Sequence, residues 1–584
     1  MRNAKIVCTL GPASADRPTI RALSEAGMSV ARLNASHGTP EERAEVIDRT
    51  RAVDDATGEP LAVMLDMQGP EIRTAATDEP VILEEGSVVR FLEGDRVTPE
   101  EVGLSFPVDD AEPGDRVLLD DGWIETTVER VEDGVVHARV ESGGELTSHQ
   151  GVNLPGVDLD VDVVTEADRR DLELAVEKEV DFVAASFVRD ASDIYEVSDA
   201  LDELGGDVPV IAKIERAGAL ENLAEIAEAS YGIMVARGDL GVECPLEDVP
   251  MIQKRLIRIS HEAGTPVITA TEMLDSMVHA RRPTRAEASD VANAVLDGTD
   301  AVMLSGETAI GDHPVRVVET MDRIVREIEA TEEYTESVER RVPPAAEEAR
   351  TEALARSARY LARDTGAAAI VAASESGYTA RKTAKFRPGV PVVATTPDDR
   401  VRRQLALSWG VHPRYADYSG GVEEVFEGAV RAALDTGVAE SGDTIVVLSG
   451  MMTELEDANT TNMLKLHVAA EAIAHGRKVV GGRAVGPLAR TDDGDLSTIP
   501  DGAVLALDTE FEGEFDGDTS RLAAIVDARP GMSGYPALVA RELDIPMISG
   551  APMPADVADG TTVTVHGERG VVYEGDVIRD SREP

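Results

Sequence analysis

One stretch of the chain, residues 209–241, places a lysine and two carboxylates where they could do chemistry together. Lys213 and Glu215 close a short apolar run two residues apart, so both side chains leave the same face of a strand. Asp239 follows the next apolar run. Two carboxylates suit Mg²⁺, which keeps coordination positions for substrate oxygens and water, and a lysine suits a phosphate group. The group therefore favours phosphoryl transfer, in which catalysis is mainly positioning and charge stabilisation.

The elements that position this group repeat along the chain. Pro209–Ile214 and Gly232–Ala236 are typical of buried strands, and Ala219–Ala229 between them has the apolar spacing of a helix. Eight such strand–helix units in about 240 residues favour an α/β fold of the (β/α)₈ TIM-barrel type over an open sheet. The side chains that follow the strands would then meet at one face of the barrel. The other six expected strands are Lys5–Leu10, Ser29–Leu33, Leu61–Leu65, Asp181–Phe187, Pro266–Thr271 and Ala301–Leu304.

Polar residues at the ends of the other expected strands would complete the site. Arg32 and Arg73 can bind phosphate oxygens bidentately. Structural alternatives remain open for single features: a lysine–glutamate pair alone fits an ion pair at a barrel rim, and Thr271 alone is more often a strand residue. Residues 34–37 alone fit a turn with a helix cap, because Asn and Ser favour such positions. The full set is Arg32, Asn34, Ser36, His37, Asp66, Glu71, Arg73, Lys213, Glu215, Arg237, Asp239, Thr271, Ser305 and Glu307.

The charge of the chain is strongly negative, since 111 Asp and Glu against 56 Lys and Arg give a formal net charge of −55. Only eight of the basic residues are lysines, and the acids are spread along the whole chain. Two interpretations are an acidic interaction protein and a cytosolic protein adapted to high salt, and the even spread favours the second. At molar salt the Debye length falls to about 3 Å, so like charges repel weakly. Because no basic patch exists to neutralise phosphates, binding to nucleic acid is not expected.

The cysteine content and the hydropathy pattern exclude two further classes of protein. With only two cysteines, Cys8 and Cys244, neither a disulfide framework nor a thiolate metal site is expected. The chain has no run of about 18 apolar residues and no segment that resembles a signal peptide. The sequence therefore predicts a soluble cytoplasmic protein without a membrane partner.

The alternation of strands and helices is interrupted once and is followed by two further regions. After the third expected strand, short alternating segments with turn signals predict a small inserted β-barrel domain. A charged segment with a Pro pair, residues 331–346, is predicted to be a linker. The predicted domains are the catalytic barrel at 1–69 and 156–330, the inserted β lid domain at 70–155, an α/β regulatory domain at 347–475 and a Gly-, Pro- and Asp-rich domain at 476–584.

Several long motifs, in order along the chain, resemble the pyruvate kinase family over residues 1–475. They include KIVCTLGPAS, GMSVARLNASHG, LDMQGPEIRT, VIAKIE, GIMVARGDLGVE and PTRAEASDVANAVLDGTDAVMLSGET. The resemblance implies transfer of a phosphoryl group from phosphoenolpyruvate to ADP, giving pyruvate and ATP, with Mg²⁺ (or Mn²⁺) and K⁺ as cofactors. It also implies a homotetramer and allosteric control through residues 347–475. An enolate-forming C–C lyase and a non-catalytic metabolite sensor are the alternatives; the inserted domain argues against the first, and the retained site residues argue against the second.

The resemblance also implies a role for each residue that matches a motif. Lys213 would stabilise the phosphoryl group during its transfer, with Arg73 and Thr271 as further catalytic residues. Glu215 and Asp239 would bind Mg²⁺. The other implied contacts are Arg32, Lys213, Gly238, Asp239 and Thr271 for phosphoenolpyruvate, Asn34, His37 and Arg73 for the nucleotide, and Asn34, Ser36, Asp66 and the backbone carbonyl of Met67 for K⁺.

The sequence departs from the family pattern at positions that bear on the cofactors and the nucleotide. Met67 and Gln68 stand where the family usually has Thr-Lys, and a carbonyl ligand survives the first change. Gln150 replaces a lysine that usually contacts nucleotide phosphate from the inserted domain. Either ADP then binds more weakly, or Mg²⁺ and arginine carry more of the charge. Glu71 stands where members that dispense with K⁺ tend to carry lysine, so it predicts K⁺ dependence, which suits a salt-rich cell.

The segment SESGYTAR, residues 374–381, resembles the loop of the family that binds an effector phosphate. Its hydroxyl and backbone N–H groups would surround an anion. A helix-capping loop is the alternative, because no Lys or Arg lies among the hydroxyl residues. The residues implied are Ser374, Ser376 and Thr379.

Residues 529–550 resemble the swivelling phosphohistidine domain of phosphoenolpyruvate-utilising enzymes. In that family a histidine follows Thr-Ser, whereas here Tyr535 stands at that point. A tyrosine cannot replace an imidazole as a phosphate carrier. The last domain is therefore expected to be structural.

Overall fold

The computed structural model describes residues 1–120, 122–157, 161–346, 349–418, 422–450, 461–470 and 472–577. The chain divides into two compact units. The first contains Met1–Pro344 together with two later segments, Ala384–Arg387 and Asp399–Pro413. The second contains Ala345–Thr383, Pro388–Asp398 and the chain from Arg414 onward.

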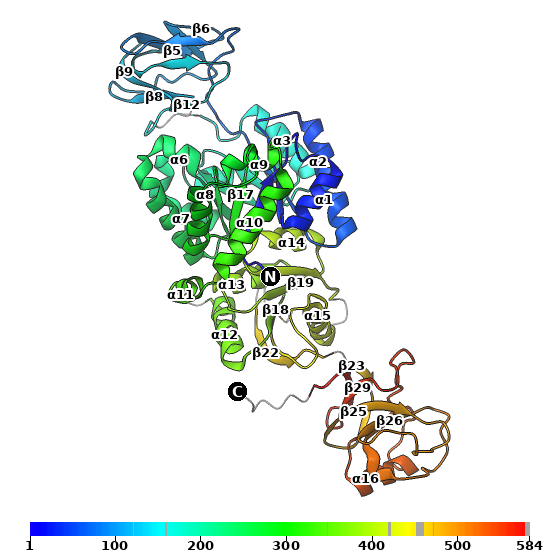
Figure 1. Ribbon diagram of the computed structural model, residues 1–584. Coiled ribbons are helices and arrows are strands. Elements are labelled where there is room, and N and C mark those ends of the chain that lie inside the picture. The colour runs from blue at the N-terminus through cyan, green and yellow to red at the C-terminus, as the bar shows by residue number, and fades with distance from the viewer. Residues whose placement is uncertain are drawn as a thin grey trace. The chain divides into compact units, whose positions relative to one another are not determined.

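The first unit is built around a closed barrel of eight parallel strands (Figure 1). Neighbours around the barrel follow the order β1-β17-β16-β15-β14-β13-β3-β2, which confirms the predicted (β/α)₈ barrel and its eight strands. The strands are nearly continuous apolar runs because both of their faces are buried. Their bounds are β1 (Lys5–Thr9), β2 (Val30–Asn34), β3 (Ala62–Asp66), β13 (Phe182–Ala185), β14 (Val210–Ile214), β15 (Gly232–Ala236), β16 (Val267–Ala270) and β17 (Ala301–Leu304).

Helices connect successive strands and cover the outside of the barrel (Figure 1). Helix α2 begins at a capping box on Thr39 and ends at Gly58 in the left-handed conformation. The same two signals, at Thr284 and Gly298, bound α8. The elements are α1 (Arg17–Ala26), α2 (Pro40–Thr57), α3 (Glu166–Glu177), α4 (Ala191–Glu203), η1 (Ala217–Glu221), α5 (Leu223–Ala229), α6 (Arg237–Glu243), η2 (Leu246–Asp248), α7 (Val249–Ala263), η3 (Asp275–Val278), α8 (Arg285–Asp297), α9 (Gly306–Ala309) and α10 (Pro314–Glu329).

Helices α6 and α11 lie where the sequence predicted none. Helix α6 starts directly after β15, so Asp239 is on the first turn of a helix rather than at the end of a strand. The expectation of a linker at 331–346 is wrong in part, because this segment contains α11 (Glu332–Arg340). The helix is anchored by Tyr334, whose buried hydroxyl accepts a hydrogen bond of 3.1 Å from the Trp409 indole. The charged residues of this segment predicted a linker, whereas the buried contact of Tyr334 with Trp409 makes it part of the folded unit.

A later segment, residues 399–413, closes the end of the barrel at which its strands begin. Helix α14 (Asp399–Gln404) and the 3₁₀ turn η4 (Leu405–Leu407) belong to the same compact unit as the barrel. Leu407 is fully buried in the hydrophobic cluster inside the barrel, together with Phe182 and Ile211. One leucine from outside the barrel sequence thus completes the barrel core.

The inserted domain lies between β3 and α3 and has a hydrophobic core of its own. Its strands form a seven-stranded sheet in the order β12-β8-β9-β10-β5-β7-β6 and a separate pair, β11-β4. This confirms the all-β character predicted for the insert. The bounds are β4 (Val81–Leu83), β5 (Val88–Glu93), β6 (Val97–Thr98), β7 (Glu101–Leu104), β8 (Arg116–Leu119), β9 (Ile124–Glu132), β10 (Val135–Ser142), β11 (Gly144–Leu146) and β12 (Val152–Asn153).

A five-stranded α/β sheet has the order β20-β19-β18-β21-β22, and all of its strands except the first residues of β20 belong to the second unit. Strand β18 pairs in parallel with both β19 and β21, whereas β22 runs antiparallel to β21 at the edge. The bounds are α12 (Arg350–Thr365), β18 (Ala369–Ala373), α13 (Tyr378–Lys385), β19 (Val392–Thr396), β20 (Val411–Tyr415), α15 (Val422–Asp435), β21 (Thr444–Ser449) and β22 (Met463–Val468).

The last part of the chain forms an eight-stranded sheet in the order β23-β30-β29-β25-β26-β27-β28-β24. The sequence analysis started this region at residue 476, but β23 pairs with β30, so residues 472–475 belong to the later sheet. No local signal shows a pairing with a strand so far along the chain. The bounds are β23 (Ala472–His475), β24 (Arg477–Val480), β25 (Arg483–Arg490), β26 (Ala503–Leu507), η5 (Thr519–Arg521), β27 (Leu522–Asp527), α16 (Tyr535–Leu543), β28 (Met547–Ser549), β29 (Thr562–His566) and β30 (Val571–Glu574).

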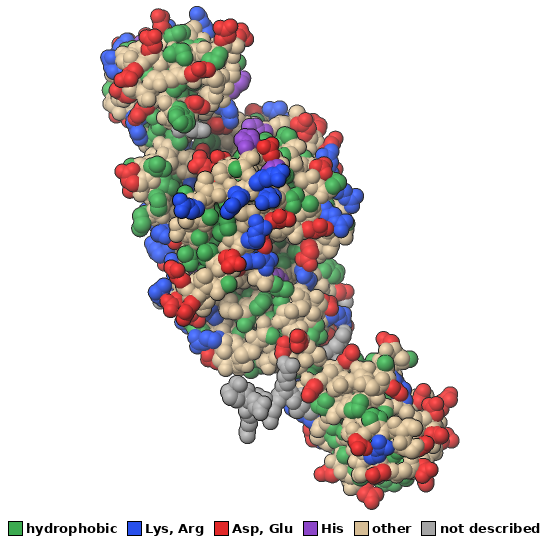
Figure 2. All heavy atoms as spheres, viewed as in Figure 1, with side chains coloured by type: hydrophobic (Ala, Val, Ile, Leu, Met, Phe, Trp, Pro, Cys, Tyr) green, Lys and Arg blue, Asp and Glu red, His purple; other side chains and the backbone are tan. Residues whose placement is uncertain are grey.

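On the face that Figure 2 shows, several Lys and Arg side chains lie close together over the middle of the barrel. On that face, Asp and Glu side chains are scattered over the insert, the barrel and the C-terminal regions, with Lys and Arg between them. None of the helices in the described part of the chain is long and apolar enough to cross a membrane.

The leucine inside the barrel gives a test of how the barrel base is closed. Leu407→Ala should lower the free energy of unfolding by about 2–5 kcal/mol, because it leaves a cavity in a core that cannot collapse fully. Urea unfolding followed by circular dichroism measures the loss. The matched control is Leu246→Ala, whose leucine is 74% exposed and should matter by less than about 0.5 kcal/mol. Equal effects of the two substitutions would contradict the role of Leu407 in closing the base of the barrel.

Candidate active site

Lys213 lies at the centre of a polar cluster at the carboxyl ends of the barrel strands. Its ammonium group is 2.8 Å from Oε1 of Glu215 and 3.1 Å from Oδ1 of Asp66. It also donates a hydrogen bond of 2.6 Å to the Ser186 hydroxyl. Burial works to lower the pKa of Lys213, but the two carboxylates outweigh burial and raise the pKa above its usual value. The lysine is therefore a cation that stays charged and is held from three sides.

A second buried cation, Arg32, shares Asp66 with the lysine. Nε of Arg32 is 2.6 Å from Oδ2 of Asp66, and Nη1 donates a hydrogen bond of 2.9 Å to the Thr9 hydroxyl. Burial works to raise the pKa of Asp66, whereas Arg32 and Lys213 together hold this pKa below its usual value. Two cations and two carboxylates, the second being Glu215, thus balance one another inside the barrel mouth.

The second oxygen of Glu215 is held by the backbone. It accepts a hydrogen bond of 2.7 Å from the Phe187 N–H. Phe187 has φ = 58°, in the left-handed region that bulky residues rarely adopt. Strained backbone of this kind is concentrated at functional sites, where the surrounding structure stabilises it. The carboxylate is therefore fixed between an amide and Lys213.

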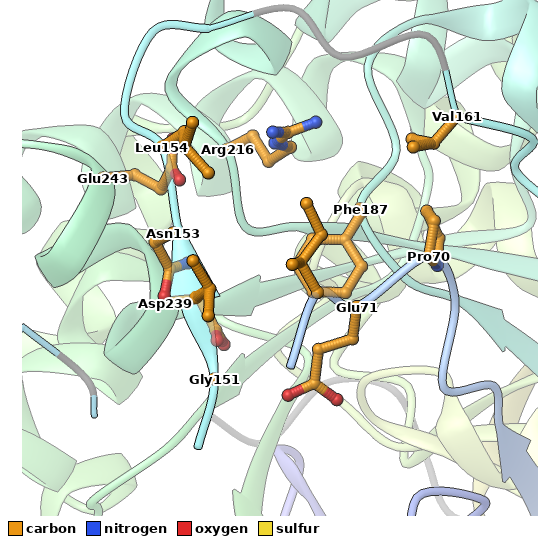
Figure 3. A pocket seen from close by; sticks show the side chains of 12 residues that line it. Pro70, Glu71, Gly151, Asn153, Leu154, Val161, Phe187, Arg216, Asp239 and Glu243 are labelled. Atoms are coloured by element: carbon orange, nitrogen blue, oxygen red, sulfur yellow. The ribbon is translucent and has the colours of Figure 1, made fainter. Parts of the chain in front are cut away.

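Asp239 lies on the first turn of α6. It lines a cavity of about 60 Å³ where the two connections of the inserted domain meet the barrel (Figure 3). Glu243, one turn further along the helix, lines the same cavity, and its burial raises its pKa. Among the described residues, no group of three or more His, Cys, Asp or Glu side chains is arranged to hold a metal ion.

Thr271 follows β16 in an unusual backbone conformation. Its φ is 65°, and that of Glu272 is 52°, both in the left-handed region. The Thr271 hydroxyl accepts a hydrogen bond of 2.8 Å from the Gly238 N–H and donates one of 2.8 Å to the Ala270 carbonyl. The first of these bonds joins the loop after β16 to the start of α6, so Thr271 and Gly238 lie side by side.

Two charged residues from the expected set support loops of the site. Arg237 donates a hydrogen bond of 2.7 Å to the Thr271 carbonyl, which steadies the strained loop. Glu307 is buried and accepts hydrogen bonds from the N–H groups of Leu274, at 3.0 Å, and Ser305, at 2.6 Å. Burial raises the pKa of Glu307 in spite of these bonds. Both residues act on the backbone of neighbouring loops.

The residues expected to bind K⁺ lie at the neighbouring ends of β2 and β3. Asn34 and Asp66 are direct partners across the two strands. Oδ1 of Asn34 accepts a hydrogen bond of 3.2 Å from the Ser36 N–H, and the Met67 carbonyl accepts one of 2.7 Å from the Ser186 hydroxyl. The backbone pairing thus makes Asn34 and Asp66 neighbours, and Met67 follows Asp66 directly.

A larger cavity, of about 770 Å³, opens beside Arg32. Asn34 and His37, two of the residues expected to bind the nucleotide, line it. Its apolar lining includes Pro12, from the loop after β1, and Ile310, which follows α9. The sequence analysis assigned these two residues no role, although the GPAS motif carried part of the resemblance. Only the closure of the barrel, which pairs β1 with β17, brings them to one cavity.

Arg73 lies apart from the lysine cluster, on the connection that leads into the inserted domain. Its guanidinium group is 2.8 Å from Oε2 of Glu71 and donates a hydrogen bond of 2.9 Å to the His149 carbonyl. Gln150, on the return connection, donates its side-chain N–H to the Thr147 hydroxyl. Both side chains therefore contact the connections of the insert.

The loop expected to bind an effector follows β18 in the second unit. Ser374 and Thr379 are buried: the Ser374 hydroxyl accepts the Thr379 N–H at 3.3 Å, and the Thr379 and Thr461 hydroxyls are 2.7 Å apart. Ser376 is exposed. The bond from the Thr379 N–H to the Ser374 hydroxyl agrees with the helix-capping alternative.

Tyr535 is the first residue of α16 in the last sheet domain. Its ring meets the ring of Phe515 edge-on, with the ring centres 5.5 Å apart. Beside it, a cavity of about 350 Å³ is lined by Arg529, whose Nε lies 3.2 Å from Oδ1 of Asp527. The tyrosine thus serves as a packing residue of this domain.

Comparisons with known proteins identify three domains. The model for the pyruvate kinase barrel domain matches residues 1–318, that for the pyruvate kinase alpha/beta domain matches 352–467, and that for the mobile domain of PEP-utilising enzymes matches 499–570. The pyruvate kinase of Geobacillus stearothermophilus is 41% identical over 586 residues, which cover 98% of this chain and 99% of the relative. The pyruvate kinases of Bacillus licheniformis and Staphylococcus aureus (strain USA300) are each 39% identical over 98% of this chain and 99% of theirs. These relatives confirm the resemblance and extend it through the last domain.

The charge balance of the cluster is open to a stability test. Asp66→Asn should lower the free energy of unfolding by about 3–5 kcal/mol, because it leaves Arg32 and Lys213 buried with too little negative charge. Chemical denaturation measures the difference. The control is Asp48→Asn, which breaks a pair with Lys178 in which the aspartate side chain is 63% exposed, and should cost less than about 1 kcal/mol. If Asp66→Asn lowered the free energy of unfolding by no more than Asp48→Asn does, the charges of Asp66, Arg32 and Lys213 would not be coupled.

Proposed function

The chain is a phosphotransferase of the pyruvate kinase family, and from this premise we propose that it transfers a phosphoryl group from phosphoenolpyruvate to ADP, giving pyruvate and ATP. The bond between phosphorus and the enol oxygen breaks, a bond forms from a β-phosphate oxygen of ADP to phosphorus, and the enolate carbon takes up one proton. The observation that carries the proposal is the buried, charged Lys213, held between Asp66 and Glu215 at the mouth of the barrel.

Lys213 is proposed to stabilise the phosphoryl group while it is bound to neither partner. Its raised pKa keeps the ammonium group charged at neutral pH, and its contacts with Asp66, Glu215 and Ser186 aim it before the substrate arrives. A charge that is already oriented needs no reorganisation in the transition state, which makes such electrostatic stabilisation effective. Arg32, which shares the Asp66 carboxylate with Lys213, would hold phosphate oxygens beside the lysine.

The donor set at Glu215 and Asp239 fits Mg²⁺ or Mn²⁺. Both residues offer carboxylate oxygens, the ligands that hard divalent cations prefer, and two protein ligands leave room for substrate oxygens and water. The bound cation would neutralise charge on the phosphate oxygens. Glu215 is already oriented by the Phe187 amide, so its geometry does not depend on the metal.

Thr271 and Gly238 are proposed to line the substrate pocket next to this carboxylate pair. The hydrogen bond between them fixes the threonine hydroxyl at the edge of the strained loop. We assign to Thr271 the face at which the enolate carbon gains its proton. Arg237 contributes by bracing the loop carbonyl and not by contact with substrate.

The cavity of about 770 Å³ beside Arg32 is proposed to receive ADP. Its volume lies within the range of about 300–1,000 Å³ that is usual for small-molecule sites. The apolar lining at Pro12 and Ile310 suits a purine ring, while Asn34 and His37 offer polar contacts. Arg73 would reach the phosphates from the connection to the inserted domain, where Gln150 supplies no charge.

K⁺ is proposed to bind among Asn34, Ser36, Asp66 and the carbonyl of Met67. Oxygen atoms of this kind replace the hydration shell of K⁺. The pairing of Asn34 with Asp66 across β2 and β3 supports the assignment. Glu71, four residues after Met67, is the basis for expecting that activity depends on K⁺.

Three broader proposals rest on the family and on the charge. We propose a homotetramer in the cytoplasm, as is usual in the family, with neither nucleic acid nor a membrane as partner. The net charge of −55 supports adaptation to a salt-rich cell, where screening weakens repulsion between acids. The last domain is proposed to be structural, because Tyr535 cannot carry a phosphoryl group.

Allosteric control is proposed to act through the α/β domain, at Ser374, Ser376 and Thr379. Strand β18 lies between β19 and β21: the chain continues from β18 toward one edge of the sheet, through β19, and later returns to its other side at β21. Open α/β sheets bind ligands at such a switch point. The loop after β18 carries these hydroxyls. The buried state of two of them leaves the exposed Ser376 and backbone N–H groups as the accessible contacts.

A C–C lyase acting on pyruvate-like substrates is the alternative enzyme class. The two matched pyruvate kinase domains argue against it. A coupled assay with phosphoenolpyruvate and ADP, at several K⁺ and Mg²⁺ concentrations, separates the two activities. The absence of ATP under all of these conditions would end the kinase proposal.

The role of Lys213 can be tested by kinetics. Lys213→Met should lower kcat by at least about 10²–10³-fold while phosphoenolpyruvate still binds, because it removes a charge used in the transition state. Steady-state kinetics and direct binding of phosphoenolpyruvate provide the two measurements. The control is Lys178→Met, a surface lysine paired with Asp48, which should keep wild-type kinetics. A loss confined to KM would mean that Lys213 serves ground-state binding only.

The role of Glu71 can be tested by ion substitution. Glu71→Lys should keep most of its activity when K⁺ is replaced by a bulky organic cation, because the ammonium group supplies the missing positive charge. The wild type should lose most of its activity under the same conditions. The control is Glu25→Lys, which makes the same change of charge at a surface residue paired with Arg21. Equal K⁺ dependence of both variants would refute the assignment.

A further inference from the structure

Strands β3 and β13 carry two of the three partners of Lys213. β3 ends at Asp66, and Ser186 directly follows β13. Here the strands are tied together, because the Met67 N–H donates to the Ala184 carbonyl at 3.0 Å and the Ser186 hydroxyl donates to the Met67 carbonyl at 2.7 Å. The surroundings of the lysine therefore depend on how β3 lies against β13.

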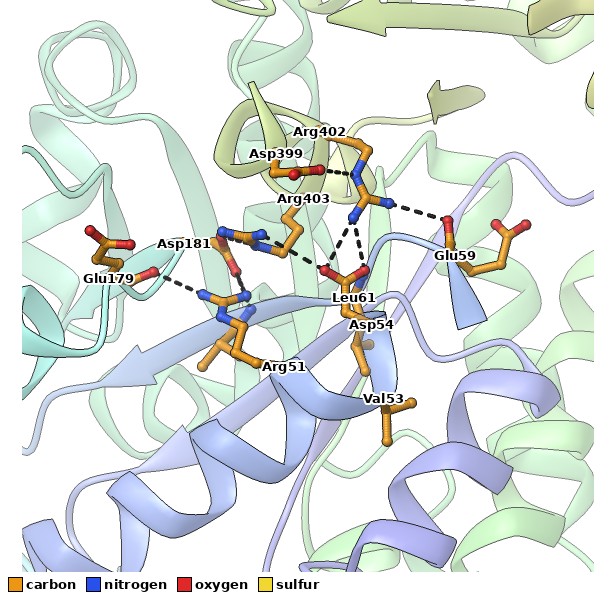
Figure 4. A network of polar contacts seen from close by, with 12 residues as sticks. Arg51, Val53, Asp54, Glu59, Leu61, Glu179, Asp181, Asp399, Arg402 and Arg403 are labelled. Atoms are coloured by element: carbon orange, nitrogen blue, oxygen red, sulfur yellow. Dashed lines mark hydrogen bonds and ion pairs between the residues drawn. The ribbon is translucent and has the colours of Figure 1, made fainter. Parts of the chain in front are cut away.

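At their opposite ends, the same strands are joined by Asp181, the residue before β13. Its Oδ2 accepts a hydrogen bond of 2.7 Å from the N–H of Val63 in β3 and lies 2.7 Å from Nη1 of Arg51. Its Oδ1 accepts one of 3.0 Å from Nε of Arg403 on α14 (Figure 4). The carboxylate is fully buried, so each of these contacts is shielded from water.

A second buried carboxylate, Asp54 at the end of α2, lies beside it. Its Oδ1 accepts a hydrogen bond of 3.3 Å from the N–H of Leu61, the residue before β3. Nη2 of Arg402 is 3.2 Å from each of its oxygens, and Nη1 of Arg403 is 3.7 Å from Oδ2 (Figure 4). Burial raises the pKa of Asp54, and the two arginines oppose this rise. We call Asp54, Asp181, Arg402 and Arg403 the base clamp.

The arginines of the base clamp come from a distant part of the sequence. Helix α14 lies within residues 352–467, matched by the alpha/beta domain model, yet it belongs to the compact unit of the barrel. Arg387, from the same region, makes a parallel contact. It lies 3.1 Å from Oδ2 of Asp300, the residue before β17, and this oxygen accepts the N–H of Val267 in β16 at 3.0 Å. Of these two contacts, the base clamp acts on β3 and β13, which lead to the partners of Lys213, whereas the contact of Arg387 acts on β16 and β17.

We propose that Arg402 and Arg403 are positioning residues: by fixing β3 against β13 at the base of the barrel, they fix Asp66 and Ser186 around Lys213 at its mouth. The proposal rests on the function proposed for the lysine. The two ends are separated by about five residues of strand, roughly 16 Å at 3.3 Å per residue. Both strands are buried throughout, and a close-packed interior passes on a displacement because it has no voids to absorb it.

The test uses the full-length chain with Arg403→Met. This variant removes the ion pair of α14 with the Asp181 carboxylate but leaves that carboxylate paired with Arg51, so no buried carboxylate loses every cation. Loosening β3 should displace Asp66 and Met67, both proposed K⁺ ligands. The apparent K⁺ concentration for half-maximal activity should therefore rise between about threefold and thirtyfold, with a lower kcat.

A second measurement does not need activity. Hydrogen–deuterium exchange followed by mass spectrometry should be faster in Arg403→Met than in the wild type in peptides covering 61–67 and 181–187. Arg403→Lys keeps the positive charge and should restore part of both effects. The matched control is Arg387→Met, which removes the parallel contact at Asp300 and should leave K⁺ half-saturation and exchange at 61–67 at wild-type values.

The outcomes separate positioning from a purely structural role. A lower melting temperature with unchanged K⁺ dependence and unchanged local exchange would overturn the proposal. If Arg403→Met does not fold, the double variant Arg402→Met with Asp54→Asn is measured in its place. It removes both charges of one ion pair, so neither is left buried without its partner, and the amide oxygen at position 54 can still accept the hydrogen bond from the Leu61 N–H. If the wild type forms no ATP, the proposed function fails, and exchange still decides: an increase confined to the two peptides supports the coupling, and a uniform increase or none rejects it.

Discussion

The buried pairing of Lys213 with Asp66 and Glu215 is the interaction on which the rest of this structure depends. An unpaired ion in such a place would cost several kcal/mol, so each charge must be matched and hydrogen-bonded. Four strands meet this requirement at one end of the barrel, since Arg32 comes from β2, Asp66 from β3 and Lys213 from β14, while Ser186 follows β13. The closure of the barrel brings these side chains together at one end.

Much of the polar structure around this cluster supports the backbone. Phe187 and Thr271 hold left-handed conformations, and each is stabilised by a hydrogen bond to a residue of the site. Arg237 and Glu307 use their charges on carbonyl and N–H groups of neighbouring loops. At the opposite end of the barrel, the base clamp and Leu407 close the core with residues that lie far along the chain. Rigidity at both ends lets a small number of reactive groups keep their geometry.

Local patterns predicted the barrel well because each strand is a short apolar run and several helices, among them α2 and α8, have their own capping signals. They failed where the deciding contact was distant. Helix α11 was read as a linker because its charges are visible in the sequence, whereas the contact of Tyr334 with Trp409 is not. The pairing of β23 with β30 was missed for the same reason. Helix α6 was not expected either, because it follows β15 without a turn, and Asp239, expected at the end of that strand, lies on the first turn of the helix.

The sequence by itself determined the family, the eight strands and the types of residue at their ends, because motifs and periodicity are local properties. It placed Lys213 and Glu215 on one face, since a strand repeats every two residues. Only the tertiary structure decided which partners these residues have: that Asp66 is shared with Arg32, that Pro12 and Ile310 line one cavity, and that α14 belongs with the barrel. Such contacts arise when the barrel closes and brings together residues that are far apart in the chain.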